Sequence, residues 1–258
     1  MAAPTDDPER LARARARLAA AGVLVLYEDH LVLGIAKAAG VLSQRGPEGE
    51  DSLVEAIDAY RREAEQKAGK AFVGLVHRLD RNVSGAMVIG KSSKAASRLS
   101  EAFRTREGVE KAYVAWVDGV PERPRAVLKS VLVRDLVRRT TRARDAAEDG
   151  SEDDEAAVLE YGVEGAGEGG VRLGVVLGTG QTHQIRVQLA RAGLPILGDR
   201  KYGGPATPER ARCERVALHA RRLVVPHPVG GKPIVIEAPI PDDLLRLDRV
   251  LGMMPPVA

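Results

Sequence analysis

The sequence predicts an α+β fold in which helices pack around a mixed, mainly antiparallel sheet. Segments with strand patterns outnumber helical segments, and many follow one another without a helix between them, which disfavours a doubly wound parallel sheet. Hydrophobic residues make up 44% and charged residues 29% of the 258 residues, an ordinary globular composition that can bury a sizeable core. Because no repeat or sharp change of composition divides the chain, we expect one large domain at 23–258 with a helical extension at 1–22.

Five segments have the apolar spacing or the capping residues that are typical of helices. They are residues 6–21, 53–69, 92–107, 179–193 and 241–252. Asp6 or Asp7 can cap the first helix, and Pro8 fits its first turn. Gly69 and Gly193 are expected to end two of the others.

Between these segments lie apolar runs that predict strands. The runs are residues 23–37, 72–77, 86–90, 111–119, 127–133, 157–164, 171–178, 216–228 and 232–240. The first run is long enough for two strands joined by a turn at Glu28-Asp29-His30, and the last two runs look like a pair of strands.

Charge is distributed unevenly along the chain. The formal net charge is +3 and the sequence pI is about 9.1, which permits a polyanionic partner without requiring one. Residues 134–144 carry five arginines and one aspartate, and residues 148–155 carry six acids and no base. These stretches form either a solvated loop whose halves pair with each other, or a basic strand or hairpin that contacts phosphate. With only 3% aromatic residues, a platform of stacked aromatics for single-stranded RNA is not expected.

The cysteine and histidine content argues against a metal site. Cys213 is the only cysteine, and the five histidines are scattered, so neither a disulfide nor a metal-binding spacing is present. No run of about 18 apolar residues predicts a membrane span. The N-terminus lacks the apolar core of a signal peptide, and Asp6, Asp7 and Glu9 argue against a transit peptide, so we expect a cytoplasmic protein.

The segment HRLDRNVSG, residues 77–85, places Asp80 after an apolar run and between Arg78 and Arg81. A carboxylate that is partly buried needs a cationic or hydrogen-bonding partner. Either Asp80 accepts bonds from backbone N–H groups in a turn, or it is a functional carboxylate on a loop that Ser84-Gly85 closes with a tight reversal. Asp80 alone does not decide between these interpretations.

A polar run, TGQTHQIRVQ at residues 179–188, introduces one of the predicted helices. Helix N-termini bind anions through free N–H groups and the helix dipole, which makes the start of this run a candidate phosphate site. Arg186 then lies on the side of the helix that can reach a carboxylate. Ordinary capping by Thr179 or Thr182 explains the same pattern, and the run lacks the Lys-Ser/Thr ending of a P-loop.

Tyr113 and Asp199 each have two interpretations. Tyr113 shares one face of its strand with Ala115 and Val117. It is either a core residue or a tyrosine that stacks on a ligand base with its hydroxyl near a proton in transit. Asp199 lies among glycines and is expected to order its turn rather than to act as a second catalytic carboxylate.

Taken together, five stretches resemble the RluA-type family of RNA pseudouridine synthases. They are HRLDRNVSG with Lys91 after it, KAYVAWVDG, LGTGQTHQIRVQLARAGLPILGDRKYG, LHARRLVVPHP and, near the N-terminus, YEDHLVLGIAKAAGVLSQ. The resemblance runs from about residue 23 to about residue 240, and the order and spacing of several motifs make it specific. It implies the pseudouridine synthase fold, with a central active-site cleft, and an isomerase that converts uridine in RNA to pseudouridine without a cofactor or a metal.

The resemblance also implies roles for residues of the catalytic domain. Asp80 matches the family's catalytic aspartate, which acts on the target ribose either as a nucleophile at the anomeric carbon or as a base at C2′. Arg186 matches the arginine that pairs with this aspartate. Tyr113 matches the tyrosine that stacks on the flipped base and helps to remove the C5 proton. Arg78 matches a residue that fills the gap left by the extruded base.

Further RNA contacts are expected from the same motifs. The candidates are Arg81, Lys37, Thr182, His183 and Gln184. The expected partner is a stem-loop of rRNA or tRNA, and the expected oligomeric state is a monomer. Only about 22 residues precede the resemblance, so we expect no RNA-binding module of the S4 type, and the basic stretch and the N-terminal arginines are left to hold RNA.

The sequence departs from the family's pattern at four places. Residues 36–40 keep a lysine but lack the usual Asn and Pro, Val83 stands where Thr is common, Gln181 replaces an Arg and Gln188 replaces a His. Two other functional classes therefore remain open. One is an RNA-binding or RNA-chaperone protein that kept the fold and lost catalysis. The other is a glycosidase or nucleosidase, which needs a second carboxylate, and Asp199 is the only nearby candidate in the sequence.

Overall fold

The computed structural model describes residues 7–46, 49–135, 137, 140–144, 156–209 and 212–253. Contacts along the chain divide it into two compact units. Unit one is Met1–Val109 with Leu223–Ala238, and unit two is Glu110–Arg222 with Pro239–Ala258. The division into an extension at 1–22 and a domain at 23–258 stays a prediction.

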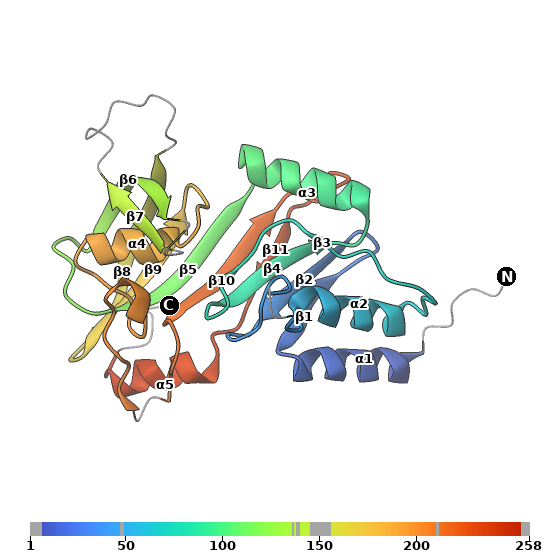
Figure 1. The fold of residues 1–258 in the computed structure, drawn as a ribbon, viewed down its shortest axis with the longest axis horizontal. Coiled ribbons are helices and arrows are strands. Elements are labelled where there is room, and N and C mark those ends of the chain that lie inside the picture. The colour runs from blue at the N-terminus through green and yellow to red at the C-terminus, as the bar shows by residue number, and fades with distance from the viewer. Residues whose placement is uncertain are drawn as a thin grey trace. The chain divides into compact units, whose positions relative to one another are not determined.

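Unit one is built on an antiparallel sheet with β2 between β1 and β4, and the short β3 pairs with β4 (Figure 1). Its strands are β1 (Val23–Glu28), β2 (Val32–Lys37), β3 (Gly74–Leu75), β4 (Ser84–Gly90) and β11 (Ile234–Glu237). Its helices are α1 (Pro8–Ala20), α2 (Leu53–Ala64) and α3 (Ser93–Thr105), and α1 packs against α2.

Side-chain caps fix where the helices of unit one begin. Asp7 accepts hydrogen bonds from the N–H groups of Glu9 and Arg10, and Pro8 occupies the first turn of α1, as the sequence predicts. Ser52 begins α2 in a capping box, and Ser92 caps α3. The prediction that α2 reaches Gly69 is wrong, because Gln66 adopts a left-handed φ of 52° directly after the helix.

The core of unit one forms around β4, whose seven residues are all buried. The cluster consists of Val32, Ala86, Val88, Leu99, Leu223, Val225, Ile234, Ile236 and Ala238. Burial on both faces explains why this strand reads as a continuous apolar run. The strand predicted at 72–77 is shorter in the structure, at Gly74–Leu75, and on its N-terminal side the carbonyl of Phe72 accepts a hydrogen bond from the side chain of Arg61.

The turn between β1 and β2 forms where the sequence predicts it. The carboxylate of Asp29 accepts hydrogen bonds from the N–H groups of Leu31 and Val32, each at 2.7 Å, which are typical of an aspartate at a turn. His227 lies 2.8 Å from the other carboxylate oxygen. Burial alone would raise the pKa of Asp29, but the bonds from His227 and the two N–H groups outweigh it and lower that pKa to about 2.

In unit two, antiparallel strands follow one another in the order β5-β9-β8-β6-β7. Its strands are β5 (Glu110–Val117), β6 (Arg125–Asp135), β7 (Thr140–Arg144), β8 (Ala157–Gly167) and β9 (Gly170–Leu177), and β10 (Leu218–Val225) begins in it. Its helices are α4 (Gln184–Arg191), a 3-10 turn at Arg200–Tyr202 and α5 (Asp242–Val250). The fully buried Trp116 donates its indole N–H to Asp248 at 2.6 Å, which docks α5.

The arginine-rich stretch forms a hairpin within unit two. β6 and β7 pair from Val131 opposite Arg144 to Asp135 opposite Thr140. Residues 134–135 and 140–144 therefore lie in paired strands, which favours the interpretation as a basic strand or hairpin, and its contact with phosphate stays a prediction. The acidic residues 148–155 lie outside the described residues, so the alternative of pairing between the two stretches stays open.

Candidate active site

Asp80 lies on a short loop, residues 77–83, that connects β3 to β4; we call it the Asp80 loop. Leu79 and Val83 are buried, with 6% and 2% of their surface exposed, and they anchor the loop on either side of Asp80. The N–H of Val83 donates to the carbonyl of Asp80 at 3.1 Å, which closes a turn. The side chain of Asp80 is half-buried, whereas Arg78 and Arg81 are exposed. The loop therefore fixes the backbone of Asp80 between two apolar contacts.

Two polar side chains, the half-buried His77 and the buried Ser43, fix the Asp80 loop further. His77 accepts a hydrogen bond from the N–H of Val88 at 3.0 Å, and its ring stacks on Phe103 at 4.5 Å between centroids. The buried hydroxyl of Ser43 donates to the carbonyl of Leu79 at 2.7 Å. The bond of Ser43 is buried and that of His77 is partly buried, so breaking either is costly.

Lys37 is held beneath the same loop. Only 1% of its surface is exposed, and its ammonium group donates to the carbonyls of Ala38, Val41 and Arg81 at 2.9, 2.9 and 3.3 Å. Arg81 itself donates to the carbonyl of Gly40 and to the carboxylate of Glu50. A direct contact of Lys37 with RNA would require its side chain to leave these carbonyls, whereas Arg81 is already at the surface.

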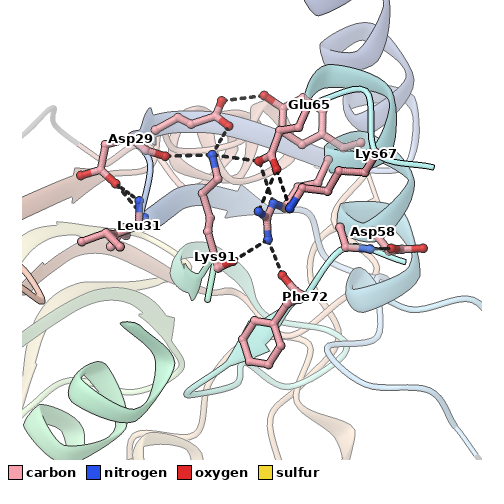
Figure 2. A network of polar contacts seen from close by, with 12 residues as sticks. Asp29, Leu31, Asp58, Glu65, Lys67, Phe72 and Lys91 are labelled. Atoms are coloured by element: carbon pink, nitrogen blue, oxygen red, sulfur yellow. Dashed lines mark hydrogen bonds and ion pairs between the residues drawn. The ribbon is translucent and has the colours of Figure 1, made fainter. Parts of the chain in front are cut away.

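A partly buried ion cluster secures the chain that leads into the Asp80 loop; it consists of Glu28, Arg61, Glu65 and Lys91 (Figure 2). Arg61 binds Glu65 through two hydrogen bonds of 2.8 and 2.9 Å, and it also donates to the carbonyls of Phe72 and Lys91. Lys91 lies 3.0 Å from both Glu28 and Glu65. Since each charge has an opposite partner, the burial is offset, and β1, α2 and the end of β4 are joined.

Electrostatics in this cluster favour the ionised acid. Burial would raise the pKa of Glu65, but the hydrogen bonds from Arg61, Lys91 and Lys67 outweigh it and lower that pKa to about 2. Burial, together with the hydrogen bond to Glu28, raises the pKa of Tyr60 to about 12. Glu65 therefore stays ionised through the neutral pH range.

In unit two, Arg186 extends from α4 and binds a buried carboxylate. Its Nε lies 2.7 Å and its Nη2 lies 2.8 Å from the two carboxylate oxygens of Asp199, which is 1% exposed. This two-pronged geometry is the strongest arrangement of an arginine with a carboxylate. The sequence predicts that Asp199 orders its turn, and the N–H groups of Tyr202 and Gly204 do donate to its carbonyl. The binding of Arg186 by its side chain is an additional role that sequence reasoning missed.

Tyr113 lies on β5, opposite Val175 of β9. It is half-buried, and the next four residues along the strand, 114–117, are fully buried. Tyr113 therefore lies where the core of unit two gives way to a partly exposed edge. This position is compatible with a stacking role, which stays a prediction.

The polar run before α4 is arranged differently from the expectation. α4 begins at Gln184, and its N-cap is His183, which has a left-handed φ of 59° and no side-chain capping bond, so neither Thr179 nor Thr182 caps it. Gln184 is 2% exposed; its amide oxygen accepts from the hydroxyl of Thr179 and its amide nitrogen donates to Val158. An RNA contact by Gln184 would require it to give up these bonds, whereas Thr182 and His183 are half-buried.

The predicted site residues fall into the two units. Unit one holds Asp80, Arg78, Arg81 and Lys37, and unit two holds Tyr113, Arg186, Thr182, His183 and Gln184. The pairing of Asp80 with Arg186 joins residues of different units and stays a prediction. Besides the side chain of Asp199, sequence reasoning missed Tyr202, which touches His183 and Arg186. The three-residue spacing of Asp199 and Tyr202 is the signal that could have drawn attention to both.

Across the residues that the structure describes, no group of three or more His, Cys, Asp or Glu side chains is arranged to hold a metal ion. In the same part of the chain, every helix is too short or too polar to cross a membrane.

The chain is similar in sequence to proteins of a known family. A family model described as RNA pseudouridylate synthase matches residues 31–191. The chain is 33% identical over 219 residues to the dual-specificity RNA pseudouridine synthase RluA of Escherichia coli O6:H1, covering 84% of this chain and 93% of that protein. It is 35% identical over 248 residues to the ribosomal large subunit pseudouridine synthase D of Xanthomonas campestris, covering 88% and 69%.

Solved structures support the same fold. Human RNA Pseudouridylate Synthase Domain Containing 4 matches with a TM-score of 0.78 and 22% identity over 96% of this chain and 99% of that chain. Human RNA Pseudouridylate Synthase Domain Containing 1 matches with a TM-score of 0.67 and 21% identity over 92% and 97%. The fold predicted from the sequence is thereby confirmed. With the family model matching most of its length, the chain belongs to the RNA pseudouridine synthases, a family of isomerases that act without a cofactor.

Proposed function

We propose that this protein isomerises specific uridines of rRNA or tRNA to pseudouridine, with Asp80 as the catalytic carboxylate. The observation that carries the proposal is the Asp80 loop, in which the buried Leu79 and Val83 and the hydrogen bond of His77 fix a half-buried carboxylate in a chain of this family. A catalytic group must be held by its surroundings in the geometry that the reaction needs.

The proposed reaction conserves all atoms. The bond between C1′ of the ribose and N1 of the base breaks, the base turns, and C5 bonds to C1′ while the C5 proton leaves and N1 gains one. Asp80 assists either as a nucleophile at C1′ or as a base at C2′. Both routes require a flipped nucleotide, because neither the ribose nor the base can be reached or turned inside a helix.

The other site residues have complementary proposed roles. Arg186 pairs with Asp80, and Tyr113 stacks on the flipped base and assists loss of the C5 proton. Arg78, exposed next to Asp80, fills the gap that the extruded base leaves in the RNA. Arg81 supplies a phosphate contact beside it.

The proposed partner is a stem-loop of rRNA or tRNA, bound by a monomer in the cytoplasm. The printed names of two relatives, a dual-specificity RNA pseudouridine synthase and a ribosomal large subunit pseudouridine synthase, support these RNA classes. The hairpin formed by β6 and β7 offers exposed Arg134 and Arg142 for phosphate contacts. Thr182 and His183 are the proposed RNA contacts at the start of α4.

The proposal is tested by mapping pseudouridine in the RNA of cells that carry the wild-type gene, an Asp80→Ala gene or a control gene with Asp118→Asn. Asp118 is an exposed acid of unit two and makes a suitable control. We expect one or a few sites to vanish with Asp80→Ala and to persist with Asp118→Asn. Retention of every site would contradict the proposal.

A catalytically inactive RNA-binding or RNA-chaperone protein is the competing function. The replacement of Arg by Gln181 and the altered sequence at 36–40 favour it, because both remove residues that are usual in the family. It predicts that the wild-type protein binds RNA but that no pseudouridine depends on it, so the same mapping experiment separates the two.

A further inference from the structure

Tyr202 contacts three parts of unit two at once. Its hydroxyl accepts a hydrogen bond from the N–H of Thr141 on β7 at 3.1 Å, and it lies 2.6 Å from Nδ1 of His183. The guanidinium carbon of Arg186 lies 5.0 Å from the centre of its ring. A single side chain therefore joins the arginine-rich hairpin, the start of α4 and the proposed partner of the catalytic carboxylate.

The hydrogen bonds at the hydroxyl are mutually consistent. Because Thr141 donates its N–H to the tyrosine oxygen, the hydroxyl proton of Tyr202 is available for donation to Nδ1 of His183. His183 is the N-cap of α4 and adopts a left-handed φ of 59° without a capping bond of its own. The bond to Tyr202 helps to hold this uncommon conformation in place.

Arg186 is fixed from two directions by one loop. Asp199 binds the edge of its guanidinium through two hydrogen bonds, and the ring of Tyr202 lies against it within cation–π distance. Both residues lie in the tight loop that ends at Gly204, where a Cβ would come within 1.8 Å of the carbonyl oxygen of Ile196. The geometry of the loop thus sets the orientation of Arg186.

The hairpin is tied to α4 at a second point. Arg191, in the last turn of α4, donates to the carbonyl of Ala143 at 2.5 Å, two residues after Thr141. α4 lies against β7 in the structure (Figure 1). Arg142, between these two attachment points, is exposed. A shift of the hairpin, for example when it binds a phosphate backbone, would therefore be transmitted to α4 through the contacts of Tyr202 and Arg191.

We propose that Tyr202 is a positioning residue that couples the β6–β7 hairpin to Arg186. When the hairpin binds RNA, Arg186 is then already oriented for its role in the reaction. The coupling runs from Thr141 through the tyrosine hydroxyl to His183, and from the tyrosine ring to Arg186. This inference rests on the proposed function, because it assigns Arg186 to the reaction and the hairpin to RNA.

Two substitutions separate the two contacts of the tyrosine. Tyr202→Phe removes the hydroxyl and keeps the ring, so KM for RNA should rise by about 3- to 10-fold, the value of one hydrogen bond, with kcat nearly unchanged. Tyr202→Leu removes the ring as well, and kcat should fall too. Tyr161→Phe is the matched control, because this tyrosine is buried in the same unit and its hydroxyl makes no hydrogen bond to the described residues.

The coupling itself is measured with Arg142→Ala in both backgrounds. If the hairpin acts through Tyr202, the loss of RNA affinity caused by Arg142→Ala should be smaller in Tyr202→Phe than in the wild type. If Arg142→Ala lowers RNA affinity by the same factor in Tyr202→Phe and in the wild type, the coupling is contradicted.

A readout without RNA completes the test. Hydrogen exchange of the amide of Thr141 and of its neighbours in β7 should speed up in Tyr202→Phe and stay unchanged in Tyr161→Phe, with both proteins folded. Unchanged exchange and unchanged KM in Tyr202→Phe, beside an active wild type, would overturn the inference. A wild-type protein that makes no pseudouridine would instead contradict the proposed function, whatever the exchange result.

Discussion

At the scale of single residues, two charged side chains among the predicted site residues are buried together with a polar partner. Arg186 with Asp199 and Lys37 with three carbonyls are both almost removed from water. A buried charge without a partner is costly, so each group constrains the position of the other. The side chains near the proposed chemistry are therefore held by electrostatics as much as by packing.

Asp199→Asn tests how Arg186 is positioned. The amide keeps the shape of the side chain but loses the charge, and only one of its two terminal atoms can accept from the guanidinium. We expect kcat for pseudouridine formation to fall on the order of 10- to 100-fold, the range of a misplaced catalytic group, with little change in KM. Single-turnover kinetics with saturating enzyme measure this; a rise in KM with normal kcat would mean that Asp199 serves RNA binding instead.

Lys37→Met tests whether this lysine contacts RNA, as the sequence predicts, or braces the Asp80 loop, as its burial indicates. Removing the ammonium takes a donor from three carbonyls in part-buried hydrogen bonds, so we expect a loss of about 2 kcal/mol in the free energy of unfolding. The salt dependence of RNA binding should not change. Lys70→Met, at an exposed lysine, is the control for stability. A weaker salt dependence of RNA binding, with unchanged stability, would show instead that Lys37 contacts RNA.

At the scale of secondary structure, the start of a helix could be predicted where the residue that caps it is close in sequence. The starts of α1 and α2 could be predicted because Asp7 and Ser52 cap the backbone a few residues away. The bounds of β3 could not be predicted, because the side chain of Arg61, on α2, binds the carbonyl of Phe72 just before the strand. Such contacts depend on the tertiary fold, which a local pattern does not contain.

The ion cluster predicts how stability changes with pH. Because the pKa of Glu65 is lowered from 4.5 to about 2 in the folded protein, its contribution is complete above about pH 5 and is lost as the pH falls toward 2. Asp29, with a pKa also near 2, acts in the same direction. Glu65→Gln should lower the free energy of unfolding at pH 7 and flatten its decline between pH 5 and pH 2.

Urea unfolding at several pH values measures this effect. Glu107→Gln serves as the control because Glu107 is exposed and lies outside the cluster. A Glu65→Gln protein whose stability declines with acid as steeply as the wild type would show that the cluster does not contribute as its geometry indicates.

At the scale of the whole molecule, the family could be recognised from the sequence, and the predicted site residues are divided between the two units. The α+β fold and the family could be predicted because several motifs recur in a fixed order along nearly the whole chain. The bond between Arg186 and Asp199 could not, because it joins residues 13 positions apart through a loop that only the folded chain defines. The same holds for Tyr202 and Thr141, which are 61 positions apart.

The isomerisation that we propose depends on Asp80. The most direct measurement is the release of tritium from C5 of uridine in the target RNA by purified protein, since isomerisation requires that proton to leave. Asp80→Asn keeps the size of the side chain and should retain folding and RNA binding while losing tritium release altogether. Release by Asp80→Asn at a rate near that of the wild type would contradict the account.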